Sequence, residues 1–308
     1  MDRRVTALGL THPAVILFTL CASLAHAAPI TVKDDAGQTL TLKAPAQRVI
    51  VLAPSLTEMV YEAGGGERLV GAVEYSDFPP AAQKLPRIGS NQKLDLERIA
   101  QLRPDLVLVW YHGNAQREVE RLRALKIPMF YLEPHGIADI PGALERIGRL
   151  LGTDATASAA ATRFRARHTA LQREYAGRAP LRVFYQIAQK PLLTINDQQI
   201  ISDVIRLCGG VNVFGKEPAL VPHLSTESVV AANPDVILTA KMGGGGEDAL
   251  RAMDEPSLAD WLKFGSLSAV KNRQLWLIPG DLISRHGPRI LDGAQAACHA
   301  LDDARRKP

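Results

Sequence analysis

An internal repeat constrains the fold of this chain more than any other sequence feature. The segment from Leu94 to Leu108 recurs 130 residues later, from Leu224 to Leu238. Both copies carry leucine, glutamate, proline, aspartate and a final leucine at equivalent positions, with aliphatic residues between them. A duplicated unit of this kind predicts two structurally related halves within the 308 residues.

Each copy of the repeat predicts a short helix followed by a buried strand. Asp95 in the first copy and Ser225 in the second can cap the helix, and an acidic residue just inside it suits the positive end of the helix dipole. Pro104 and Pro234 then block continuation of the helix, and the aliphatic runs behind them predict strands.

Weaker similarity links the beginnings of the two halves. Residues 48–52 and 182–186 both predict first strands, and each is followed by a helical stretch that ends in glycines, at 64–66 and 209–210. The recurring order of strand, helix, helix and strand predicts an α/β fold. We expect two Rossmann-like lobes, each built on a mostly parallel sheet.

A single long helix is predicted between the two repeats. Its apolar stripe recurs at spacings of four and three: Ala157, Ala161, Phe164, His168, Leu171 and Tyr175. Proline and glycine are absent from residue 153 until Gly177. We therefore expect an N-terminal lobe at 47–152, a connecting helix at 153–178 and a C-terminal lobe at 179–308. The alternative is an ordinary helix within one domain.

The N-terminus predicts export from the cytoplasm. Two arginines precede an apolar stretch at residues 14–25, and alanines at 25 and 27 form a cleavage motif, so residues 1–27 resemble a secretory signal peptide. The mature protein is then expected in the periplasm. Lipidation of Cys21 is the alternative, and it is disfavoured because Leu20 occupies a position where a lipoprotein signal requires a small residue.

Cleavage of that signal would leave two cysteines, Cys208 and Cys298. Two thiols in an exported protein favour a disulfide, with two buried free cysteines as the alternative. The bridge would close a loop of about 90 residues. By reducing the entropy of the unfolded chain, it would stabilise the folded state by up to roughly 4–5 kcal/mol.

Signatures of catalysis are absent from the sequence. It contains no Walker phosphate loop, no G-x-S-x-G elbow and no H-E-x-x-H zinc motif. The formal net charge of +4 is too small to favour a nucleic-acid partner. We therefore expect a binding protein that is not an enzyme.

Aromatic and polar residues follow several predicted strands, where open α/β sheets bind ligands. They occupy residues 75–80, 110–114 and 281–287. Tryptophan and tyrosine offer flat apolar area with a polar edge, which suits a large, partly planar ligand.

These segments carry a family resemblance. The shared stretches are Tyr75–Pro80, Asp95–Ile99, Pro104–Val107 with Trp110 and Asn114, Cys208–Gly210, Asp281 with Arg285, and Pro288–Ile290 leading to Cys298. In this order and spacing, from Arg48 to about Leu301, the chain resembles the periplasmic cobalamin (vitamin B12)-binding proteins of BtuCDF-type ABC importers. These belong to the metal-chelate group of solute-binding proteins.

The resemblance implies a class III periplasmic binding protein, with two lobes joined by one long helix. Cobalamin or a related corrinoid is then the transported ligand, held in the cleft, and no catalytic cofactor is expected. The resemblance places Tyr75 and Trp110 against the corrinoid, with Asp281 and Arg285 bordering it from the other lobe.

The resemblance also implies a partner for the repeated glutamates. Glu97 and Glu227, one in each copy, would dock onto arginines of an inner-membrane permease dimer that carries its ATPase subunits. The protein is expected to be a monomer when free. The alternative is that both glutamates merely favour helix N-termini.

The chain departs from the family where Asn91, Leu193 and Val221 replace cleft aromatics. A haem or ferric-siderophore protein of the same fold is therefore the alternative function. Candidate haem ligands are Tyr75, Tyr111, His112, His223 and His286. A siderophore would favour the basic residues Arg285 and Lys241. A bare-ion site is disfavoured because the histidines do not cluster in sequence.

Overall fold

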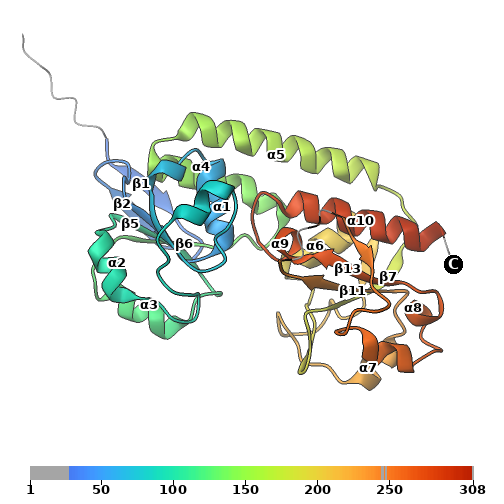
Figure 1. The fold of residues 1–308 in the computed structure, drawn as a ribbon. Coiled ribbons are helices and arrows are strands. Elements are labelled where there is room, and N and C mark those ends of the chain that lie inside the picture. The colour runs from blue at the N-terminus through green and yellow to red at the C-terminus, as the bar shows by residue number, and fades with distance from the viewer. Residues whose placement is uncertain (1–27, 244–245, 247, 307–308) are drawn as a thin grey trace, which may run out of the picture.

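The computed structural model describes residues 28–243, 246 and 248–306, and it contains two mostly parallel sheets that lie side by side with helices on both faces (Figure 1). The predicted signal peptide, residues 1–27, lies outside the described residues. Among the residues described, no helix has both the length and the apolarity needed to cross a membrane.

The N-terminal lobe contains a four-stranded sheet in the order β4-β3-β5-β6, and every pair in it is parallel. Its strands are β3 (Val49–Val51), β4 (Leu69–Ala72), β5 (Leu106–Trp110) and β6 (Met129–Leu132), and a hairpin of β1 (Ile30–Lys33) and β2 (Thr39–Leu42) precedes them. Its helices are α1 (Pro54–Glu62), α2 (Leu96–Leu102), α3 (Gln116–Arg123) and α4 (Ile140–Leu151), with short 3-10 turns η1 (Gly66–Arg68), η2 (Pro80–Lys84) and η3 (Ile137–Asp139).

The C-terminal lobe contains a five-stranded sheet in the order β10-β7-β11-β13-β12, parallel except at β12. Its strands are β7 (Leu181–Gln186), β10 (Gly210–Asn212), β11 (Val236–Lys241), β12 (Leu250–Arg251) and β13 (Leu275–Pro279), with a separate hairpin of β8 (Ala188–Gln189) and β9 (Leu192–Leu193). Its helices are α6 (Ile200–Leu207), α7 (Thr226–Ala232), η4 (Ala259–Lys263), α8 (Ser268–Lys271), α9 (Gly280–Ile283) and α10 (Ile290–Arg306).

The two sheets share one topology. In each, the first parallel strand lies between the second and the third, and the fourth follows the third. The predicted glycine caps are also present, since Gly64 and Gly209 follow α1 and α6 with φ of 82° and 73°. The α/β fold with two mostly parallel sheets is therefore confirmed. The hairpin β8–β9, which separates β7 from α6, was not expected from the sequence.

The repeated Pro-Asp pair ties each third strand to the start of the first. The carboxylate of Asp105 accepts the backbone N–H of Arg48 at 2.9 Å, and that of Asp235 accepts the N–H of Arg182 at 2.8 Å. Each arginine in turn donates to a carbonyl in the last turn of α2 or α7. These bonds explain why the repeat includes an aspartate after the proline.

The predicted helix caps are present in both copies. Asp95 accepts the N–H of Arg98 at 2.9 Å, and Ser225 accepts the N–H of Ser228 at 3.1 Å. Each helix ends at a left-handed residue directly before the proline, Arg103 or Asn233. The same seven-residue helix therefore recurs in both lobes.

Helix α5 (Asp154–Glu174) follows the first sheet, precedes the second and lies along the back of both lobes (Figure 1). It packs on α1 and α4 of the N-terminal lobe and on α10 of the C-terminal lobe. The predicted stripe is its buried face, with Ala157, Phe164 and Leu171 almost inaccessible to solvent. The chain thus places one uninterrupted helix across the junction.

The apolar core has three parts that fix the layers. The largest includes the stripe of α5 together with residues from α1, α4, α6 and α10. The other two lie on the opposite faces of the sheets, under α2 and α3 in one lobe and under α7 and α8 in the other. Helices α2 and α7 therefore cover the faces that point away from α5.

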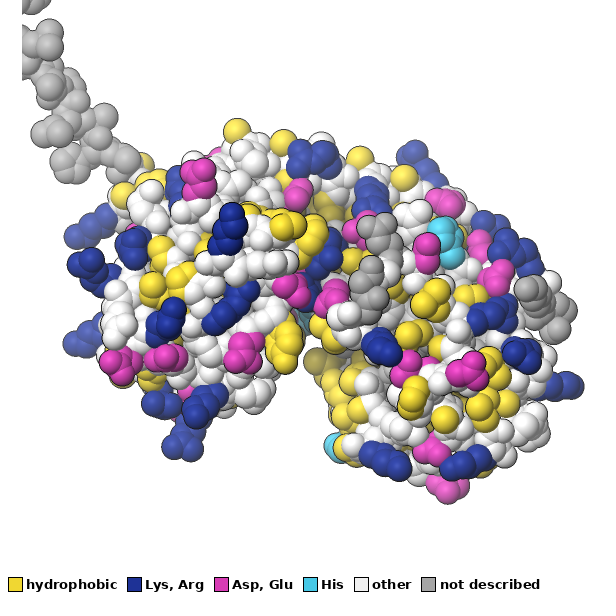
Figure 2. Space-filling view, viewed as in Figure 1, with side chains coloured by type: hydrophobic (Ala, Val, Ile, Leu, Met, Phe, Trp, Pro, Cys, Tyr) yellow, Lys and Arg dark blue, Asp and Glu magenta, His cyan; other side chains and the backbone are white. Residues whose placement is uncertain are grey.

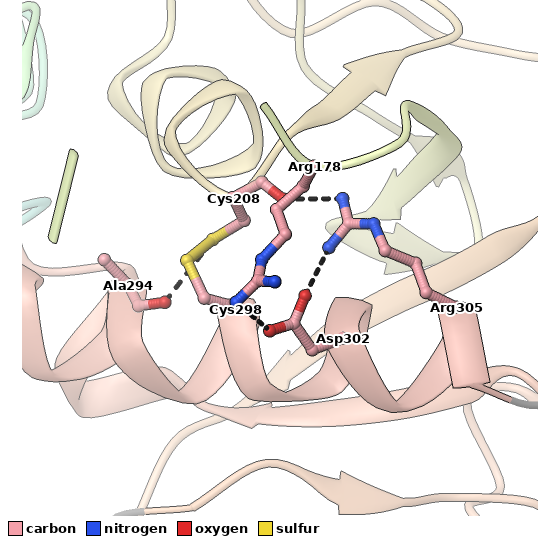
Figure 3. The surroundings of a disulfide bond; sticks show 6 residues. All are labelled: Arg178, Cys208, Ala294, Cys298, Asp302 and Arg305. Atoms are coloured by element: carbon pink, nitrogen blue, oxygen red, sulfur yellow. Dashed lines mark hydrogen bonds and ion pairs between the residues drawn. A yellow bond between two sulfur atoms is a disulfide. The ribbon is translucent and has the colours of Figure 1, made fainter. Parts of the chain in front are cut away.

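A disulfide joins the end of α6 to the middle of α10, which confirms the predicted pair Cys208 and Cys298 (Figure 3). Both cysteines are fully buried. Arg305 donates to the Cys208 carbonyl at 2.7 Å and to Asp302 at 2.7 Å, and Asp302 also pairs with Arg178 at 3.3 Å. The disulfide and the ion pairs around it hold α10 against α6 and the start of β7.

Candidate functional site

A cavity of about 480 Å³ lies between the two lobes, at the carboxyl ends of both sheets. The space-filling view shows the groove that separates the two halves (Figure 2). The N-terminal wall consists of Trp110, His112, Gly113, Glu133, Pro134 and His135. The C-terminal wall includes Tyr185, Ile187, Gln199, Leu220, Val221, Met242, Ser284 and His286. The position matches the one where parallel α/β sheets bind their ligands.

Trp110 ends β5 and is held on the wall by its own loop. The side chain of Asn114 accepts the Trp110 N–H at 2.8 Å and donates to the Leu52 carbonyl at 2.8 Å. Gly113 lies directly against the indole, since a Cβ added there would come within 1.9 Å of the ring. Asn91 supports the same loop by donating to the Gly113 carbonyl at 3.1 Å. Asn91 therefore supports the loop that holds the tryptophan.

Beside it, His112 is paired with a buried carboxylate. Glu133, which follows β6, accepts a hydrogen bond from Nδ1 of His112 and another from the His112 backbone N–H at 3.1 Å. The imidazole itself is exposed, at 62% of its side-chain area, while Glu133 is at 7%. The ring of Tyr111 packs against it with centroids 4.2 Å apart. This part of the wall is therefore preorganised.

The opposite wall is mainly apolar, with one buried imidazole. Gln199 uses its carbonyl oxygen to accept the Ile201 N–H at 2.6 Å, so its amide nitrogen faces Nε2 of His286 at 3.2 Å. His286 therefore accepts at Nε2 and carries its proton on Nδ1. Burial, followed by the nearby charge of His135, lowers the pKa of His286 to about 4, against a smaller opposing effect of the Pro134 carbonyl. His286 is neutral at physiological pH.

Two buried ring N–H groups flank the cavity, and neither makes a hydrogen bond of normal geometry with the described residues. They are Nε1 of Trp110 and Nδ1 of His286, whose rings meet edge to face with centroids 6.0 Å apart. An unmade hydrogen bond at a buried donor costs about 1–3 kcal/mol. Both atoms are buried, so a ligand could reach them only if the side chains around them rearranged.

An ion-pair cluster joins the lobes next to this cavity. Arg285, at 5% exposure, donates to Glu58 at 2.9 Å, to Asp77 at 2.7 Å and to Asp281 at 2.7 Å. Arg289 pairs with the same Glu58 at 2.6 Å. Glu58 and Asp77 belong to the N-terminal lobe, so these contacts span the junction. We refer to these five residues as the interlobe cluster.

The interlobe cluster also perturbs a carboxyl group within it. Partial burial of Asp77 acts to raise its pKa, but the hydrogen bond and positive charge of Arg285 outweigh burial, and the net pKa is lowered. On the N-terminal side, Phe78 lies under the Arg289 guanidinium, 3.9 Å from the ring centroid. The loop after β4 is therefore held by the C-terminal lobe through charge and through cation–π contact.

The residues predicted to contact a ligand occupy three environments. Trp110 lines the interlobe cavity. Tyr75 is 73% exposed with φ of 62° and is not among the residues that line it. Asp281 lines a second cavity of about 420 Å³ and binds both Arg285 and the Gly243 N–H. Ligand contact by Tyr75, Asp281 and Arg285 stays a prediction.

Sequence reasoning did not single out Glu133, His135 or Gln199. Glu133 and His135 follow the fourth strand of the first lobe, so the rule that directed attention to the other strand ends could have found them. Gln199 precedes α6, and no sequence pattern indicates that it reaches His286.

The repeated glutamates lie on equivalent exposed positions. Glu97 and Glu227 both occur in the first turn of their helices, α2 and α7, and both are exposed. The backbone N–H of Glu227, and then the Ser225 hydroxyl, lower the pKa of the Glu227 carboxyl. Both carboxylates therefore stand on the faces away from α5, one on each lobe.

Comparison with known proteins identifies the family to which this architecture belongs. A family model described as "Periplasmic binding protein" matches residues 49–282, which is most of the chain. The chain belongs to the periplasmic binding protein family. The match begins at β3 and ends in α9, so it includes both sheets and α5.

Relatives within the periplasmic binding protein family have names that specify ligands. The chain is 35% identical over 263 residues to the vitamin B12-binding protein of Vibrio cholerae serotype O1, covering 85% of this chain and 92% of the relative. The crystal structure of the periplasmic vitamin B12 binding protein BtuF of Vibrio cholerae superposes with a TM-score of 0.75, at 35% identity, covering 85% of this chain and 99% of that one. The periplasmic heme-binding protein RhuT from Roseiflexus sp. RS-1 superposes at 0.70 with 22% identity, covering 84% and 99%, which shows the fold alone.

Proposed function

We propose that this protein captures cobalamin or a related corrinoid in the periplasm and delivers it to an inner-membrane ABC permease. The observation that carries the proposal is 35% identity to a vitamin B12-binding protein over 85% of the chain, together with Trp110 on the wall of the interlobe cavity. The protein binds its cargo without transforming it and uses no catalytic cofactor.

The physical character of the cavity supports a bulky chelate. One wall supplies an indole and the other supplies Ile187, Leu220 and Val221, so a large apolar surface can be buried between them. The exposed imidazole of His112 adds a polar group to the N-terminal wall. Apolar faces with a few placed polar groups are the usual makeup of small-molecule sites.

The proposal includes export and a two-lobed organisation. Residues 1–27 act as the signal peptide, and the mature chain comprises lobes at 47–152 and 179–308 with a connecting segment at 153–178. Helix α5 occupies 154–174 of that segment and contacts helices on both sides, which supports this division.

The test is direct titration of the mature protein. Calorimetry with cyanocobalamin, hemin and a panel of ferric siderophores is expected to give tight binding for the corrinoid and much weaker binding for the others. Matched titrations of Trp110→Ala should show loss of corrinoid affinity. Tight siderophore binding without corrinoid binding would overturn the proposal.

Haem is the second candidate ligand, because three histidines, His112, His135 and His286, line the cavity. A protein whose name specifies heme binding, RhuT from Roseiflexus sp. RS-1, shares the fold at 22% identity. A new Soret band on hemin addition, without corrinoid binding, would assign the chain to haem instead.

Delivery is proposed to use Glu97 and Glu227 as contacts with arginines on the two permease subunits. The supporting observations are their exposure, their equivalent helices and their shared position on faces away from α5. The double variant Glu97→Ala with Glu227→Ala is expected to bind corrinoid normally while uptake falls. The matched control changes Glu67 and Glu174, which are exposed and lie outside α2 and α7. Equal uptake by the two double variants would contradict the docking role.

A further inference from the structure

One imidazole on the cavity wall has the arrangement of a metal ligand. His112 lines the interlobe cavity, and its Nδ1 is bonded to Glu133, a carboxylate at 7% exposure. An ionised carboxylate only accepts hydrogen bonds, so Nδ1 is the donor and the neutral ring keeps its lone pair on Nε2. No described residue makes a hydrogen bond to that nitrogen. A carboxylate that fixes the tautomer and raises ring basicity is the usual support behind a metal-binding histidine.

The carboxylate is itself fixed in place. The backbone N–H of Glu133 donates to Asp35 at 2.7 Å, and Asp35 is held by Arg146 at 2.6 Å. Glu133 also accepts the backbone N–H of His112, so two bonds orient the imidazole. The orientation of the ring is therefore set before any ligand arrives. Ligand binding then requires little further loss of side-chain entropy from His112.

The other two histidines of the cavity lack this arrangement. His286 has Nε2 against the Gln199 amide and Nδ1 buried, so neither nitrogen is available without rearrangement. His135 is exposed, and its backbone N–H, rather than its ring, donates to Asp139 at 3.1 Å. His112 is thus the imidazole that combines a carboxylate support with a free nitrogen.

A single imidazole does not bind a bare ion tightly. Among the described residues there is no group of three or more histidine, cysteine, aspartate or glutamate side chains that could hold one. A macrocyclic chelate differs, because the macrocycle supplies the equatorial ligands and leaves only axial positions for the protein. The site therefore suits a metal that arrives already chelated.

We propose that Nε2 of His112 is an axial ligand to the metal at the centre of the transported chelate. This rests on the proposed function and adds the coordination mode. For a cobalt corrinoid with an exchangeable axial water, the cobalt–water bond breaks, a cobalt–nitrogen bond forms and water leaves. The oxidation state is unchanged and no proton is transferred, since the attacking nitrogen carries none.

The test compares two corrinoids that differ in the axial ligand. Aquacobalamin carries exchangeable water, whereas cyanocobalamin carries cyanide, which an imidazole does not displace. Binding of aquacobalamin to the wild-type protein is expected to shift its visible absorption maxima, and His112→Ala is expected to abolish the shift and weaken aquacobalamin binding by at least about 10-fold. Cyanocobalamin should show no shift and the same affinity, within about 3-fold, for both proteins.

Two further variants separate coordination from packing. Glu133→Gln keeps the shape but weakens the support, so the shift should remain while aquacobalamin affinity falls by about 10-fold. His299→Ala, an exposed histidine away from this cavity, should change neither quantity. Circular dichroism confirms that each variant is folded.

The outcomes separate the two proposals. Normal aquacobalamin binding without a spectral shift, or the same shift in His112→Ala, would overturn axial coordination and leave the proposed function intact. Failure of the wild-type protein to bind either corrinoid would overturn the proposed function, and the coordination with it.

Discussion

The two lobes repeat the same strand order, helix caps and Pro-Asp anchor, yet the walls that they present to the cavity differ in chemistry. The N-terminal wall carries Trp110 and the His112–Glu133 pair, whereas the C-terminal wall is mostly aliphatic around His286. The stabilising devices differ as well, since the disulfide belongs to the C-terminal lobe alone and residues 28–207 contain no cysteine. The two lobes thus share one frame, while the loops after their strands differ.

The largest expected difference between the lobes concerns the disulfide. Cys208→Ala combined with Cys298→Ala should lower the free energy of unfolding by about 4 kcal/mol, because the bridge closes a loop of 90 residues. Scanning calorimetry should show a melting temperature lower by roughly 10 °C. A change under about 2 °C would mean that packing of α6 on α10 suffices without the bond.

The next effect concerns the interlobe cluster that joins the lobes. Arg285→Ala should destabilise the protein by about 3 kcal/mol, because Glu58, with 2% of its side chain exposed, then retains only Arg289 as a cation. Denaturant unfolding measures this loss. Arg165→Ala is the control, since its pair with Glu145 is exposed and should contribute less than about 1 kcal/mol. Equal losses would show that the cluster does not couple the lobes.

Affinity provides a comparison of the two walls. Trp110→Ala is expected to weaken corrinoid binding by about 30-fold, as for a large aromatic anchor, whereas Val221→Ala on the other wall should change it by less than about 3-fold. Isothermal titration calorimetry measures both. If Val221→Ala had the larger effect, the C-terminal wall would be the principal binding surface.

The stability of the protein at acidic pH tests whether the His286 imidazole of the C-terminal wall is buried. The pKa of His286 is about 4, below the value of about 6.5 in an unfolded chain, so the unfolded state binds the extra proton between these values. Stability of the ligand-free protein should therefore fall by about 2–3 kcal/mol as pH decreases from 6.5 to 4. Urea unfolding of His286→Gln should show a correspondingly smaller decrease. Parallel pH profiles for the two proteins would place His286 in a more solvated environment.

The smallest expected effect concerns the two repeated aspartates that follow the prolines, Asp105 and Asp235. Asp105→Ala and Asp235→Ala should each cost about 1 kcal/mol in the free energy of unfolding. The Asp105 substitution should cost more, because Asp105 accepts the backbone N–H groups of both Gln47 and Arg48, whereas Asp235 accepts the backbone N–H of Arg182. Matched chemical denaturation curves decide the order, and the reverse order would contradict the account of the repeat.

The frame was predictable because it depends on local rules. Caps at Asp95 and Ser225, stops at Pro104 and Pro234 and the stripe of α5 each reflect interactions between residues close in sequence. The disulfide was predictable because Cys208 and Cys298 are the two cysteines that follow the predicted signal peptide. Such features need no knowledge of how the lobes meet.

The site was less predictable because it forms between distant segments. The predicted ligand residue Arg285 is enclosed by Glu58 and Asp77, which lie more than 200 residues away in the chain. The contact of Gln199 with His286 likewise depends on how α6 meets the loop after α9. No local pattern encodes such pairings, so sequence reasoning located the loops but not their partners.

Helix α5 has a consequence for how an empty protein differs from a loaded one. Its 21 residues form a rod about 30 Å long, packed on both halves of the molecule. A backing of that kind permits little change in the outer dimensions, so scattering profiles recorded with and without cargo should nearly coincide. Under the proposed function, the permease would then recognise a loaded protein from the ligand exposed at the open side rather than from a change in overall shape.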